Sequence, residues 1–116
     1  SLGLLSVGVL NLNNMRDIQS DKLSDKRTLA VKLGKKNSKV YHIILIVSAM
    51  LIASLFIILY FKSYSNLLFL VTYIPLVIHL KKIYHAKEPN DFDSQLKVLA
   101  LTAFVFSLLM GIGYII

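Results

Sequence analysis

The fold is decided by an unbroken apolar run at residues 40–61, VYHIILIVSAMLIASLFIILYF. This run of 22 residues contains no Asp, Glu, Lys or Arg. As a helix it would be roughly 33 Å long, which is enough to cross the hydrocarbon core of a bilayer. Residues 63–80 and 98–116 are two further uncharged runs. The sequence therefore predicts an all-α fold, a polytopic bundle of transmembrane helices.

The composition supports a membrane protein and excludes several other classes. Of the 116 residues, 56% are hydrophobic and only 16% are charged, and there is no cysteine. A soluble domain of this size needs a more polar surface. A disordered tail would be less hydrophobic. A disulfide scaffold, a thiolate metal site or a cysteine nucleophile would need cysteine.

Residues 1–15 are also uncharged, and they begin with serine rather than methionine. They lack the basic start and the small-residue cleavage site of a signal peptide. We interpret them as the second half of a membrane span. On this interpretation residues 1–116 are the C-terminal portion of one larger integral membrane domain.

The formal net charge of +7 is concentrated in two segments. Residues 16–39, a predicted loop, carry eight Lys or Arg against three Asp, and residues 81–97 carry four Lys. The turn at residues 62–66 holds the one remaining basic side chain, Lys62. Because basic loops stay in the cytoplasm, we expect residues 16–39 and 81–97 in the cytoplasm and the turn at residues 62–66 outside. Membrane topology explains this pattern better than nucleic-acid binding does.

Three aspartates, Asp17, Asp21 and Asp25, are spaced four residues apart beside the first apolar run. On a helix they would form one acidic stripe, and like charges at this spacing destabilise a helix by about 0.2–0.5 kcal/mol per pair. Such a stripe suggests a metal site, since Mg²⁺ takes one or two carboxylates and completes its shell with water and substrate phosphate. The alternative is a solvated loop of mixed charge, and spacing alone favours that alternative.

A longer pattern is more specific. The run NNMRDIQSD at residues 13–21, followed by KRTLAVKLG at residues 26–34, resembles the second aspartate-rich motif of the UbiA superfamily of membrane prenyltransferases. Within that superfamily it is most similar to the branch that prenylates 1,4-dihydroxy-2-naphthoate in menaquinone synthesis. Residues 92–116 also resemble the last helix of the family.

The resemblance implies a bundle of nine transmembrane helices in the bacterial inner membrane, of which this chain would be the C-terminal part. Two aspartate-rich motifs would face a cytoplasmic cavity and hold Mg²⁺ and a polyprenyl diphosphate. The implied reaction transfers the polyprenyl group to 1,4-dihydroxy-2-naphthoate. Since this chain would supply only the second motif, we expect it to be inactive alone.

The resemblance also assigns roles to individual residues. Asp25 stands where the naphthoate branch usually has glycine, so it ranks below the other two aspartates. The implied site consists of Asp17, Asp21 and Arg16 as catalytic residues, of Asn13, Asn14, Lys26 and Arg27 as substrate-binding residues, and of Asp17, Asp21 and Asp25 as metal ligands.

Three alternatives remain open. The chain would be a UbiA-type enzyme with another aromatic acceptor, a small basic membrane protein without enzyme activity, or a segment of a transporter. The transporter is disfavoured because no predicted span holds a buried acid or base. His42, His79 and His85 are expected in packing or interfacial roles, since their spacing is not that of metal ligands.

Smaller features concern packing. Pro75 predicts a kink in the second complete span, and Gly111 and Gly113 predict close helix packing in the last one. Residues 88–91, with the sequence EPND, are expected to form a loop.

Overall fold

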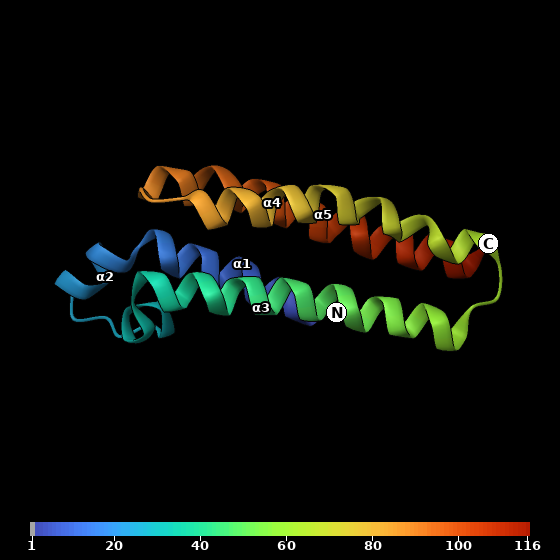
Figure 1. Ribbon diagram of the computed structural model, residues 1–116, viewed down its shortest axis with the longest axis horizontal. Helices are drawn as coiled ribbons and strands as arrows, with labels where there is room; N and C mark the ends of the chain where they lie inside the picture. The colour runs from blue at the N-terminus through green and yellow to red at the C-terminus, as the bar shows by residue number, and fades with distance from the viewer. Residues whose placement is uncertain (1) are drawn as a thin grey trace.

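The computed structural model describes residues 2–116 and folds them as helices joined by short connections (Figure 1). The bundle measures 51 × 21 × 20 Å. The predicted all-α fold is therefore confirmed. The elements are, in order, α1 (Leu2–Arg16), α2 (Ile18–Leu23), α3 (Leu29–Tyr60), the 3₁₀ helix η1 (Tyr64–Thr72), α4 (Tyr73–His85) and α5 (Pro89–Ile115).

Three helical segments are long and apolar enough to cross a membrane: Leu29–Tyr60, Tyr64–His85 and Pro89–Ile115. Each is longer than the uncharged run that predicted it, because Lys, Asp and Asn residues continue the helix at its polar end. Most of the predicted loop at residues 16–39 is helical for the same reason. The shorter helix α1 runs beside α3 along only part of the bundle (Figure 1).

The two basic segments lie at the same end of the bundle. In Figure 1, α2 and the connection between α4 and α5 lie at one end. The connection after α3 and the C-terminus lie at the other end. The alternation of basic and neutral connections along the chain therefore corresponds to the two ends of one helical bundle.

The start of α5 differs from the prediction. Residues 89–91 belong to the helix instead of a loop, and Glu88 is its N-cap. The side chain of Asp91 accepts hydrogen bonds from the backbone N–H groups of Lys87 and Glu88, both at 3.0 Å. Pro89 suits the first helical position, where a backbone N–H would have no partner inside the helix.

Two backbone irregularities shape the bundle. Gly34 has a φ of +81°, so α3 is kinked there and its first turn points away from the long apolar part. This conformation favours glycine, since a Cβ would be strained. Pro75 follows the nine-residue 3₁₀ helix η1 and lies in the first turn of α4. The predicted interruption of this span is thus confirmed, because a proline ring clashes with regular helix on its N-terminal side.

The last helix approaches η1 closely at Gly113. A Cβ there would collide with the backbone carbonyl oxygen of Ser65, whereas one at Gly111 would meet nothing within 4 Å. The carbonyl oxygen of Gly113 accepts hydrogen bonds from Asn66 Nδ2 at 2.8 Å and from Ser65 Oγ at 2.9 Å. Close packing is confirmed at Gly113.

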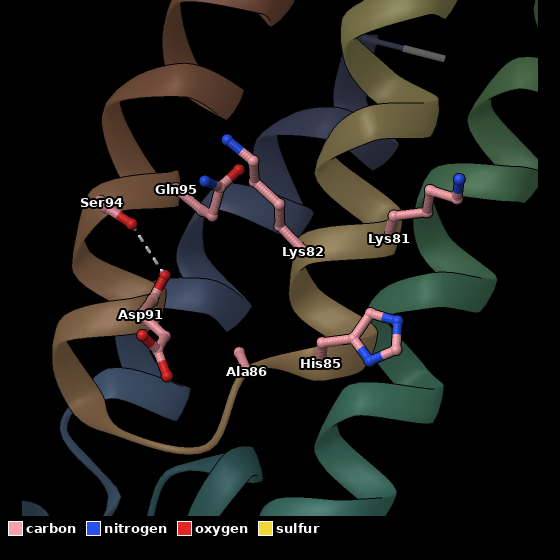
Figure 2. Close-up of a pocket in the computed structure, with 7 residues that line it drawn as sticks. All are labelled: Lys81, Lys82, His85, Ala86, Asp91, Ser94 and Gln95. Carbon is pink, nitrogen blue, oxygen red and sulfur yellow. Dashed lines mark hydrogen bonds between the residues drawn. The ribbon is translucent and has the colours of Figure 1, made fainter.

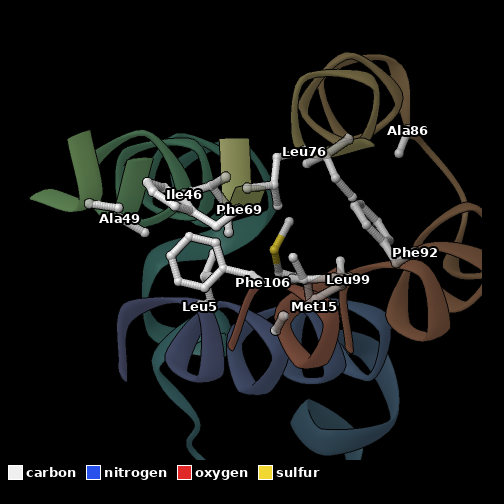
Figure 3. Close-up of a cluster of buried hydrophobic side chains, with 14 of the residues drawn as sticks. Leu5, Met15, Ile46, Ala49, Phe69, Leu76, Ala86, Phe92, Leu99 and Phe106 are labelled. Carbon is white, nitrogen blue, oxygen red and sulfur yellow. The ribbon is translucent and has the colours of Figure 1, made fainter. Parts of the chain in front are cut away.

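The buried core runs along the bundle between α1, α3, η1, α4 and α5 (Figure 3). Phe69 and Phe106 meet edge to face with ring centroids 5.4 Å apart. Many other large apolar side chains face outwards, and Ile58 is 75% exposed. An apolar surface of this extent is unfavourable in water and suits contact with lipid.

Candidate functional site

The motif at the end of α1 is organised around the guanidinium group of Arg16. Arg16 Nε donates to Asp17 Oδ1 at 3.0 Å, and Nη2 donates to Asn13 Oδ1 at 2.7 Å. Arg16 Nη1 donates to Asp93 Oδ1, on α5, at 2.8 Å. The planar fork of arginine suits several oriented acceptors at once. Arg16 therefore joins two residues of its own motif to the last helix.

The charges in this cluster stabilise one another. The hydrogen bond from Arg16 is the largest cause that lowers the pKa of Asp17, and the positive charge of Lys26 lowers it further. The hydrogen bonds to Asp17 and Asp93 raise the pKa of Arg16 above its ordinary value. Asp17 is therefore held as a carboxylate at neutral pH.

Asp21 lies on α2, one turn after Asp17, and its environment is different. Its Oδ2 atom is buried and has no hydrogen-bond partner in the structure. A buried carboxylate oxygen without a partner is unfavourable, and such groups in proteins normally have a hydrogen-bond or metal partner. Asp21 thus offers a free oxygen ligand beside the Arg16 cluster.

Asp25 does not continue the predicted acidic stripe. It follows the end of α2 and has a φ of +57°, a left-handed conformation that aspartate tolerates better than most residues. Its side chain is 91% exposed, with Oδ1 3.9 Å from Arg27 Nε. The expectation that Asp17, Asp21 and Asp25 lie on one helical face is therefore wrong. Across residues 2–116, no group of three or more His, Asp and Glu side chains could hold a metal ion.

The other predicted residues divide into two groups. Asn13 contacts Arg16, and its neighbour Asn14 is partly buried on α1. Lys26 and Arg27 are exposed on the connection between α2 and α3. Both are open to solvent at the basic end of the bundle, and Arg27 lies near the carboxylate of Asp25.

Sequence reasoning missed Asp93. It is 77 positions from Arg16, and no local spacing rule relates the two residues. A weak signal was present, because Asp93 belongs to residues 81–97, the basic segment expected on the same side of the membrane as the motif.

Sequence reasoning also missed a buried polar chain across three helices. His42 Nε2 lies 2.8 Å from His79 Nε2, and His79 Nδ1 lies 3.1 Å from Gln95 Oε1. An amide oxygen only accepts hydrogen bonds, so His79 donates from Nδ1 and accepts from His42 at Nε2. His42 Nδ1 is then an acceptor, and it is buried without a partner. The expectation that no span holds a buried base is wrong.

Two cavities lie at the basic end of the bundle. The first, of about 380 Å³, lies between the end of α4 and the start of α5. Figure 2 shows Lys82 of α4 beside Gln95 of α5, while Lys81 and His85, which also line the cavity, extend from the other side of α4. None of the motif aspartates lines it. The second cavity, of about 390 Å³, lies beside α2 and includes Arg16 in its wall.

The sequence of this chain is similar to a known family and to two known proteins. Residues 1–108 match the UbiA prenyltransferase family. The chain is 34% identical over 114 residues to the 1,4-dihydroxy-2-naphthoate octaprenyltransferase of Haemophilus influenzae, covering 98% of this chain and 37% of that protein. It is 33% identical over 111 residues to the protein of the same name from Escherichia coli, covering 96% and 36%. The chain thus spans little more than a third of each relative. No solved structure matches it.

Proposed function

Because the chain belongs to the UbiA prenyltransferase family, we propose that it forms part of an enzyme of menaquinone biosynthesis. That enzyme transfers a polyprenyl group from a polyprenyl diphosphate to 1,4-dihydroxy-2-naphthoate. The observation that carries the proposal is the assembly of Asn13, Arg16 and Asp17 into one hydrogen-bonded cluster at the basic end of the bundle. The names of the two relatives support the choice of acceptor.

Mg²⁺ is the metal that the resemblance implies, and two side chains fit it. Asp17 and Asp21 offer hard carboxylate oxygens, the ligand type that Mg²⁺ prefers, and Asp21 Oδ2 is a buried oxygen without a partner. Bound there with the substrate, the ion would neutralise negative charge that develops on the departing diphosphate. Asp25 is left out of the ligand set because its side chain points into solvent.

The remaining motif residues either orient Asp17 or supply positive charge for the diphosphate. Arg16 has its donors occupied by Asn13, Asp17 and Asp93, so it orients Asp17 rather than contacting substrate. Lys26 and Arg27 are exposed cations, and Arg27 presents the planar fork that suits phosphate oxygens. Lys26 and Arg27 would receive the diphosphate group, and Asn14 would lie beside it.

The chemistry needs no protein nucleophile. The C–O bond between the allylic carbon and the diphosphate breaks, and that carbon bonds to the electron-rich acceptor ring. The carboxyl group of the ring leaves as carbon dioxide. The apolar helices would shield the allylic cation from water and accommodate the lipid-soluble polyprenyl chain.

We also propose that the active site is completed by residues that lie outside positions 1–116. It spans little more than a third of its relatives, and residues 2–116 contain no three-ligand metal group of their own. Residues 16–39 and 81–97 would face the cytoplasm, because they carry most of the positive charge.

The test uses the longest natural protein that contains these residues, purified in detergent. It should form prenylated naphthoate only when Mg²⁺ and polyprenyl diphosphate are both present. Residues 1–116 alone should form none. Product with 4-hydroxybenzoate and none with the naphthoate would favour a different aromatic acceptor. Absence of product with any acceptor would favour a small basic membrane protein without enzyme activity.

A further inference from the structure

A second site is formed by the cavity of about 390 Å³ beside α2. It lies between the end of α1, the start of α3 and the connection into α5. Lys22 of α2 lines it, whereas Asp17 and Asp21 do not. Arg16 of the motif cluster also lines the cavity, so the two sites are neighbours. We call it the lysine-lined cavity, and its polar wall consists of Arg16, Gln19, Lys22, Lys35, Lys87 and Glu88.

The wall carries unbalanced positive charge. Arg16 is already paired with two carboxylates. Glu88 is the one acidic side chain in the wall. Within residues 2–116, the three lysines Lys22, Lys35 and Lys87 form no ion pair, and all three are exposed. Lys35 Nζ donates to the backbone carbonyl of Lys87, which ties the start of α3 to the connection that borders the cavity.

The floor of the cavity is apolar. Met15 and Phe92 line it and are only 3% and 2% exposed. Val31 adds an apolar wall from the first turn of α3. Gly34, where α3 is kinked, also lines the cavity, and its φ of +81° favours glycine. The site therefore combines a buried apolar surface with a rim of ammonium groups that form no ion pair.

This combination suits a molecule with an apolar body and a phosphate group. Basic pockets between transmembrane helices at the cytoplasmic side bind phosphate headgroups of lipids, and this cavity lies at the basic end of the spans. We propose that the lysine-lined cavity binds the phosphate headgroup of an anionic phospholipid. The proposed function assigns the polyprenyl diphosphate to Asp17, Asp21, Lys26 and Arg27, and none of these residues lines the cavity. Because a polyprenyl diphosphate shares the same chemistry, it is the competing occupant that the experiment tests.

The experiment measures binding of each ligand separately to the longest natural protein that contains these residues. Phosphatidylglycerol and farnesyl diphosphate are titrated into protein purified in a neutral detergent, and the dissociation constants are compared between two double variants. Lys22→Gln with Lys87→Gln removes two rim charges. Lys32→Gln with Lys36→Gln removes two exposed lysines from the same end of the bundle that do not line the cavity.

Each rim lysine should contribute about five-fold to binding, equivalent to roughly 1 kcal/mol. The rim variant should therefore bind phosphatidylglycerol about 25-fold more weakly, while the control variant stays within about two-fold of the wild type. Weakened binding of farnesyl diphosphate alone would show that the cavity takes the prenyl donor and would contradict the proposal.

Three further results would overturn the proposal. The wild type does not bind phosphatidylglycerol, the rim variant binds it as tightly as the wild type, or the control variant loses as much affinity for it as the rim variant does. Both variants replace exposed side chains, so folding should survive, and circular dichroism checks this. Turnover of the wild type on the same preparation tests the proposed function separately.

Discussion

Replacing Gly113 by alanine should destabilise the bundle, although alanine is the better helix former by about 1 kcal/mol. The new Cβ would collide with the carbonyl oxygen of Ser65 and lie 3.4 Å from the Cα of Asn66. Both are backbone atoms, so no flexible side chain can move aside. Overpacking of this kind costs about 1–3 kcal/mol.

The displacement would also lengthen two hydrogen bonds. Ser65 Oγ and Asn66 Nδ2 both donate to the carbonyl oxygen of Gly113, and each such bond stabilises by about 0.5–1.5 kcal/mol. After the gain in helix propensity is subtracted, we expect a net loss of about 1–5 kcal/mol. The assay is thermal unfolding in detergent, followed by circular dichroism.

Gly111→Ala is the matched control. It lies on the same helix, two residues away, and a Cβ there would meet nothing within 4 Å. This variant should be neutral or more stable by up to about 1 kcal/mol. If the two alanine variants melt at the same temperature, the close approach of α5 to η1 is refuted.

Two further predictions concern topology and the buried polar chain. Single cysteines that replace Asn37 and Ser94 should resist an impermeant thiol reagent in intact cells, while one that replaces Ser63 should react. All three positions are exposed, so each cysteine is accessible from its own side of the membrane. The opposite labelling pattern would reverse the orientation. His79→Ala leaves the buried ring of His42 without its partner, so it should lower the free energy of unfolding by about 1–3 kcal/mol, and an unchanged melting temperature would show that the contact contributes nothing.

The membrane architecture could be predicted from sequence because it depends on local properties. Long uncharged runs set the number of spans, and the positions of Lys and Arg indicate which connections share an end. Helix ends were less predictable, since residues such as Pro89 and Asp91 stop a helix in one context and start it in another. In α5, Pro89 is the first helical residue, and the side chain of Asp91 accepts hydrogen bonds from the backbone before it.

The site was predictable only where neighbours along the chain make it. Asn13, Arg16 and Asp17 lie within one helical turn, so the motif itself located their cluster. The contact from Arg16 to Asp93 and that from His42 to His79 join separate helices. Such pairs depend on how the helices pack against one another, and the spacing of residues along the sequence does not predict that packing. Asp25 was misplaced because the stripe assumed a continuous helix, and α2 ends at Leu23.

The central claim is that Asp17 and Asp21, rather than a general acidic surface, hold the metal–diphosphate complex. The most direct measurement compares Mg²⁺-dependent turnover of Asp21→Asn and Asp25→Gly in the longest natural protein, at matched expression. The account predicts that Asp21→Asn loses roughly 10²–10³-fold in rate, as expected for one lost electrostatic contact in the transition state. Asp25→Gly should stay close to the wild type, because the side chain of Asp25 is exposed. Equal losses in the two variants, or no loss in either, would contradict the claim.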